Sequence, residues 1–200
     1  MILPLLLSAQ QGDPEIEIVQ GEMERKAYKN LKRELKSADK HYSEKMFYAY
    51  QAALKKYLKI LDHYPDNAAL NYKTGICYLE TNNKQAALSY LQKAGKSNPD
   101  ITPYLNRNLG RAYHQHYRFD EAIEHYEKYK KWQRYNDGNV KKTNRKIRQC
   151  ERGKKCFLFL PVKNMPWKST KKDMCSILIT LTCPKLQAFS RKSLTLIFTK

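Results

Sequence analysis

The chain has 200 residues, of which 42% are hydrophobic and 12% aromatic, enough for one folded domain with tails. Seven glycines and eight prolines are too few for a low-complexity chain. The formal net charge of +19 suggests a nucleic-acid partner until it is mapped: residues 136–200 hold three acids and 16 bases, whereas residues 41–135 hold nine acids and 15 bases. Most of the charge therefore belongs to a C-terminal tail, which weakens the nucleic-acid interpretation.

The five cysteines do not predict a disulfide framework or a zinc site, because their number is odd and no two have C-x-x-C spacing. We expect Cys77 to be a buried, packed thiol. Near the N-terminus, the apolar run Ile2 to Leu7 is followed by small and polar residues, which resembles the end of a secretory signal peptide. We therefore expect residues 1–12 to be a truncated signal peptide, with a frayed apolar terminus as the alternative. No later run approaches the roughly 18 apolar residues of a transmembrane helix.

Hydrophobic periodicity and turn residues predict a series of helices. Asp13 and Pro14 have the pattern of a helix start, with Asp as the cap and Pro in the first turn. Pro65 and Pro99 end helices, since proline cannot continue one, and Gly138 breaks the chain again. The predicted helices are 22–44, 46–63, 67–79, 84–96, 102–116, 120–132 and 140–152.

Small residues recur along the chain at a nearly fixed period. Ala53, Ala87 and Ala122 are 34 and 35 residues apart, and Gly75 and Gly110 are 35 apart. A period of this size predicts stacked helical hairpins, in which small residues allow two helices to approach and large ones fill the space beside them. The residues expected to make this packing are Gly75, Tyr78, Ala87, Leu91, Ala94, Gly110, Tyr113, Ala122 and Tyr126.

This pattern resembles the tetratricopeptide repeat (TPR). Residues 68–100 are the best copy, and the first copy departs from the pattern because Ala38 stands where the family has glycine. The resemblance implies an all-α, TPR-like helical-hairpin solenoid (an α-α superhelix) over residues 22–135, with copies at about 36–66, 67–100 and 101–134. It also implies a protein–protein interaction scaffold or adaptor that binds a protein or peptide in a concave groove.

A narrower resemblance is carried by residues 70–79 and 109–114. These look like the N-terminal TPR region of bacterial outer-membrane proteins that continue into a WD-like propeller and a peptidoglycan-binding domain. The resemblance implies an exported protein, in the periplasm or associated with the outer membrane; a cytoplasmic location is the alternative. Residues 194–199 resemble the opening strand of such a propeller, but the peptidoglycan-binding activity cannot be carried over to this chain.

The tail at residues 156–200 has strand-like runs at 156–160, 176–182 and 194–199. We expect it to be poorly ordered or strand-like, as a fragment of a β domain. A frame-altered end and a small native β element are the alternatives.

The groove of a TPR solenoid is lined by the first helix of each hairpin. Arg107 and Arg111 are four residues apart, so their guanidinium groups point the same way. In clamp-type members of the family, two basic residues at this spacing hold a peptide carboxylate, although Ile76 here replaces their asparagine. The alternative is a solvated basic face with surface ion pairs. The candidate peptide- or anion-binding residues are Tyr72, Lys73, Tyr104, Arg107, Arg111 and His114.

We expect the basic helix at residues 138–153 to cap the last hairpin. Its cluster of Lys and Arg also suits a phosphate backbone or anionic lipid, so a nucleic-acid-binding helical-repeat protein that uses the basic C-terminal third is the rival hypothesis. His114 and His116 are two apart on a helix and face different ways, which argues against a metal site. No catalytic set or phosphate loop is recognisable, so we expect no enzyme activity, cofactor or metal.

Overall fold

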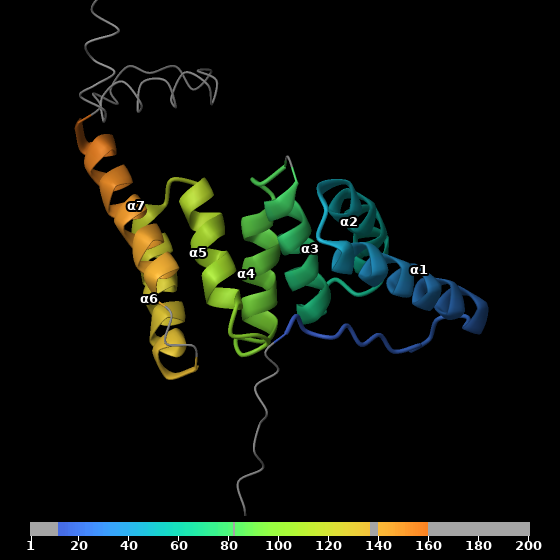
Figure 1. The fold of residues 1–200 in the computed structure, drawn as a ribbon. Coiled ribbons are helices and arrows are strands. Elements are labelled where there is room, and N and C mark those ends of the chain that lie inside the picture. The colour runs from blue at the N-terminus through green and yellow to red at the C-terminus, as the bar shows by residue number, and fades with distance from the viewer. Residues whose placement is uncertain (1–11, 82, 137–139, 160–200) are drawn as a thin grey trace, which may run out of the picture. The chain divides into compact units, whose positions relative to one another are not determined.

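The computed structural model describes residues 12–81, 83–136 and 140–159, and its contacts divide the chain into two compact units, Met1–Glu151 and Arg152–Lys200. The described elements are all α-helices (Figure 1). They are α1 (Arg25–Glu44), α2 (Phe47–Leu61), α3 (Ala68–Glu80), α4 (Ala87–Ser97), α5 (Leu105–Gln115), α6 (Phe119–Asn136) and α7 (Lys141–Phe159).

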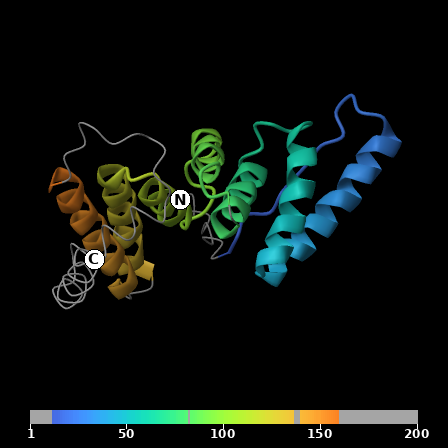
Figure 2. The ribbon, with the colours of Figure 1, turned by 90° about the horizontal axis from the view of Figure 1, so that it is seen from above.

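The helices of the first unit form three hairpins in chain order. α1 packs on α2, α3 on α4 and α5 on α6, while α2 contacts α3 and α4 contacts α5 to join one hairpin to the next. α3 and α5 also touch each other directly, so first helices of adjacent hairpins are neighbours. Figure 2 shows these antiparallel pairs from above. The predicted all-α, TPR-like fold is confirmed.

In the second and third hairpins, the two helices approach each other most closely at a glycine of the first helix. A Cβ added at Gly75 would lie 2.7 Å from Cγ of Leu91, and one at Gly110 would lie 2.8 Å from the ring of Tyr126. No side chain fits at those distances without displacing its neighbour. The predicted pairing of small residues with large partners is thus confirmed at both positions. In the first hairpin Ala38 takes the glycine's place and is fully buried.

Helix ends lie within four residues of the sequence-based boundaries, except that α7 runs seven residues further, to Phe159, and one predicted start is wrong. No helix begins at Asp13 and Pro14: residues 12–20 are extended, and a turn with Gly21 at φ +54° precedes α1. We call residues 12–20 the N-terminal segment. Pro14, Ile16 and Ile18 of this segment are buried, and the residues between them are exposed. This period-two pattern explains the extended backbone, since alternate side chains of a strand share a face.

The basic helix α7 buries one face within the first unit. Thr143, Ile147 and Cys150, spaced as one helical face requires, are buried, and Thr143 Oγ1 donates a hydrogen bond of 2.6 Å to Oε1 of Gln133 on α6. The predicted strand-like run at 156–160 is wrong over Cys156–Phe159, which continue α7. The other two runs, and residues 1–11 of the expected signal peptide, lie outside the described residues. Among the helices that the structure describes, none combines the length and apolarity needed to cross a membrane.

Candidate functional site

Polar and aromatic side chains on α1, on α3 and on or just before α5 form several local groups, which together we call the first-helix cluster. Its members are Asp39, Tyr72, Lys73, Glu80, Tyr104, Arg107, Asn108, Arg111 and His114. It contains all six candidate groove residues, together with the partners that the fold gives to several of them.

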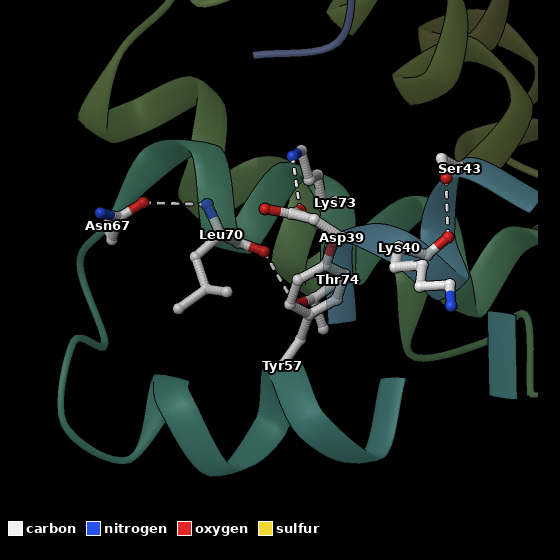
Figure 3. A network of polar contacts seen from close by, with 8 residues as sticks. All are labelled: Asp39, Lys40, Ser43, Tyr57, Asn67, Leu70, Lys73 and Thr74. Carbon is white, nitrogen blue, oxygen red and sulfur yellow. Dashed lines mark hydrogen bonds and ion pairs between the residues drawn. The ribbon is translucent and has the colours of Figure 1, made fainter. Parts of the chain in front are cut away.

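At one end of the cluster, Asp39 of α1 accepts two hydrogen bonds. Lys73 Nζ of α3 lies 2.7 Å from Asp39 Oδ1, and the hydroxyl of Tyr57 on α2 lies 2.6 Å from the same oxygen (Figure 3). Lys73 is 8% exposed, and its ammonium group also lies 5.5 Å from the centre of the Tyr42 ring. Burial is the main cause that raises the pKa of Tyr57, and the hydrogen bond to Asp39 raises it further. This hydroxyl therefore keeps its proton and remains a donor. The charge of Lys73 is therefore already paired, and this ion pair joins α3 to α1.

Tyr72 is also committed to an internal contact. Its hydroxyl accepts a hydrogen bond of 2.9 Å from Asn108 Nδ2 on α5, and both residues are 1% exposed. Burial raises the pKa of the Tyr72 hydroxyl, which therefore stays neutral. The structure thus places Tyr72 and Lys73 inside the stack of hairpins, where neither presents a free polar group to a partner.

The two arginines of the predicted clamp have different surroundings. Arg111 donates to Oε1 of Glu80 at 2.7 Å and is half-buried, so its charge is already paired with α3. The guanidinium of Arg107 lies 4.9 Å from the centre of the Tyr104 ring and 5.9 Å from that of Tyr129. Arg107 is exposed, and among the described residues no carboxylate lies within ion-pair distance of it. It is the cation of the pair that can receive an anionic group.

His114 lies at the far end of α5 in a half-buried setting. Its ring meets Phe119 edge-on, with 5.7 Å between the ring centres. Burial and the positive charge of Lys146 on α7 lower its pKa, so the imidazole is neutral at pH 7. Within the described part of the chain, no group of three His, Cys, Asp or Glu side chains gathers closely enough to hold a metal ion.

The partners of these residues were not predicted from the sequence. The bonds from Lys73 to Asp39, from Asn108 to Tyr72 and from Arg111 to Glu80 join residues 34, 36 and 31 positions apart. These separations are close to the repeat period, because equivalent turns of neighbouring first helices lie side by side. A search for opposite charges or hydrogen-bonding pairs one period apart would have found them.

Comparisons with known proteins agree with this architecture. Residues 48–107 match the tetratricopeptide repeat family model. The crystal structure of the MamA protein is similar at a TM-score of 0.53 and 23% identity, covering 66% of this chain and 67% of that one. The Sgt2 TPR domain from Aspergillus fumigatus is similar at a TM-score of 0.48 and 16% identity, covering 72% of this chain and 93% of that one. No curated protein sequence matches the chain significantly. The described residues thus form an all-α, TPR-like helical repeat, with a tetratricopeptide match over 48–107.

Proposed function

We propose that this protein is an interaction scaffold that binds a protein or peptide on the concave groove of its stacked hairpins, at the exposed end of the first-helix cluster. The observation that carries the proposal is Arg107, an exposed cation held between Tyr104 and Tyr129 without a described acidic partner. An arginine fixed against aromatic rings keeps its fork-shaped donors in position for a carboxylate. The ligand is thus an acidic side chain or a C-terminal carboxylate.

The other members of the cluster set the geometry of this groove. Because Tyr72, Lys73 and Arg111 join neighbouring first helices, they fix the spacing of α1, α3 and α5 before any partner arrives. A preorganised surface loses less conformational entropy on binding than a flexible one. The proposed site therefore has one anion contact, at Arg107, on a rigid frame.

Site-specific photo-crosslinking in cells tests this groove. A photoreactive phenylalanine analogue replaces Tyr104, next to Arg107, or Tyr48 on α2, which is 64% exposed and serves as the matched control. We expect a discrete adduct from position 104 that position 48 does not give, and we expect Arg107→Ala to reduce its yield several-fold. Equal adducts from both positions, or an Arg107→Ala variant with full yield, would contradict the proposal.

We further propose that the scaffold works in the bacterial cell envelope, in the periplasm or at the outer membrane. The support is the signal-like run Ile2 to Leu7 and the likeness of residues 70–79 and 109–114 to outer-membrane proteins of TPR, propeller and peptidoglycan-binding organisation. Residues 1–24 fused to an alkaline phosphatase without its own signal should give an active, exported enzyme. A fusion that starts at Gly12 is the control, and equal activity of the two fusions would refute export by this run.

A further inference from the structure

The N-terminal segment is bound to the hairpins as an extended peptide. Asn67 Nδ2 donates to the carbonyl of Glu17 at 2.7 Å, and the hydroxyl of Tyr64 donates to the carbonyl of Val19 at 2.6 Å. Thr102 Oγ1 makes a longer contact of 3.4 Å with the carbonyl of Gly12. These three donors lie in the loops that lead into α3 and α5, and Tyr28 of α1 donates to the carbonyl of Ile18 at 3.0 Å. The segment therefore crosses the ends of two hairpins, as its blue trace beside α3 and α2 shows in Figure 1.

These contacts recognise a backbone shape more than a particular set of side chains. In each of them a main-chain carbonyl of the segment accepts the hydrogen bond. Side-chain specificity comes from Pro14, Ile16 and Ile18, which are buried at every second position. Carbonyl bonding combined with burial of alternate side chains is the way in which proteins bind extended peptides in trans. In this chain the same contacts are made in cis.

Charge adds a second element of recognition. Residues 12–24 hold five acids and no base, whereas residues 41–135 have an excess of bases. Burial raises the pKa of Tyr72, and the charges of Asp13 and Arg107 act on this hydroxyl in opposite directions. A partner that resembles this segment would therefore carry acids at its exposed positions, as residues 13, 15 and 17 do.

We propose that the surface under the N-terminal segment is a peptide-binding site for extended, acidic partner segments with apolar residues at alternate positions, which the chain's own segment occupies and blocks. This site goes beyond the proposed groove, because its donors are Tyr28, Tyr64, Asn67 and Thr102 rather than Arg107. The turn at Gly21 tethers the segment to α1, which gives it an effective concentration on the order of millimolar. A partner must therefore compete with the tethered copy.

The test uses the full chain and a fluorescent peptide with the sequence of residues 12–20, measured by fluorescence anisotropy. The variant Ile16→Asp with Ile18→Asp releases the segment, and Val19→Asp is the matched control because Val19 is 74% exposed. We expect the released variant to bind the peptide at least tenfold more tightly than the wild type or the control. A peptide carrying both Asp changes should not bind.

The donors of the site are tested in the variant that carries Ile16→Asp and Ile18→Asp. Asn67→Asp keeps the side-chain oxygen that accepts from Leu70 N at the start of α3 but removes the donor to the peptide carbonyl. Together with Tyr64→Phe it should weaken peptide binding about tenfold while far-UV circular dichroism stays unchanged. A released variant that folds but binds no more tightly than the wild type overturns the proposal.

A second readout covers the case in which the released variant fails to fold. A fluorescent amino acid at the exposed position 19 of the otherwise wild-type chain should lose anisotropy when excess unlabelled peptide replaces the tethered segment. Unchanged anisotropy at millimolar peptide would equally overturn the proposal.

Discussion

Replacing Gly75 by Ala should destabilise the chain even though Ala is the better helix former. In a helix interior Gly→Ala gains up to about 1 kcal/mol of propensity. The added methyl at Gly75, however, would lie 2.7 Å from Cγ and 2.9 Å from Cδ2 of Leu91. Overpacking of this kind typically costs about 1–3 kcal/mol. We expect overpacking to outweigh helix propensity, so that the free energy of unfolding falls by about 1 kcal/mol.

Gly95 in α4 supplies the matched control. A Cβ there would meet only Cδ2 of Leu105 at 3.4 Å, an ordinary contact with the end of a flexible side chain. Gly95→Ala should therefore stabilise the chain by about 0.5 kcal/mol, since propensity counts for less near a helix end. Because propensity enters both variants with the same sign, most of the difference between them measures the contact with Leu91.

Urea unfolding followed by far-UV circular dichroism gives both free energies of unfolding. The double variant Gly75→Ala with Leu91→Ala provides a further check, because removing the Leu91 side chain makes room for the new methyl. We expect a favourable coupling of about 0.5–3 kcal/mol between the two changes. If Gly75→Ala proves as stable as Gly95→Ala, close approach of α3 and α4 is not the reason for glycine at this position.

Three other outcomes follow from the described contacts. Asp39→Ala removes the acceptor of two hydrogen bonds, one of them from the ammonium of Lys73. It should lower the free energy of unfolding, measured in urea, by about 2 kcal/mol. An unchanged value would show that the network in Figure 3 does not stabilise the fold. Burial lowers the folded-state pKa of His114 and His125 below 6.5, so the unfolded chain takes up protons first as the pH falls. Stability should then be full above about pH 6.5 and decline below it, and a double Gln variant should flatten this slope in unfolding curves at pH 7 and pH 5. Burial also raises the pKa of Cys77 to about 12, so this thiol should resist alkylation, read by mass spectrometry, until the chain is unfolded.

The hairpin packing was predictable because its information is periodic in the sequence. Gly75 and Gly110 mark the positions of closest approach, and Leu91 and Tyr126 stand where their large partners were expected. Cys77 was likewise expected to be a buried thiol, and it is fully buried.

The candidate groove was harder to predict, since its chemistry depends on pairs that lie one repeat apart. Arg107 and Arg111 look equivalent on a single helix, yet Glu80 pairs with only Arg111. The buried position of Lys73 depends in the same way on Asp39 of the preceding hairpin. Helical spacing tells which side chains point together, but it does not reveal which of them the neighbouring hairpin already engages.

The N-terminal segment was misread because a local rule was applied to a long-range contact. Asp13 and Pro14 satisfy the pattern of a helix start, but the alternation of Ile16 and Ile18 with acidic residues is a strand-like signal. One of its donors, Tyr28, comes 10 residues later, but Tyr64, Asn67 and Thr102 come 45 to 90 residues later, beyond any window of helical length. Burial of alternate side chains outweighed the capping preference.

The order of synthesis gives the hydrogen bond between Gly12 and Thr102 a further meaning. The hairpins are built from neighbours in sequence and can form one after another as the ribosome delivers them. The segment emerges first, but Thr102 follows 90 residues later, which takes roughly five to twenty seconds at ordinary translation rates. During that interval the segment can be held only by its bonds to Tyr28, Tyr64 and Asn67, which are synthesised earlier. The contact between Gly12 and Thr102 can form only when the second and third hairpins have been joined.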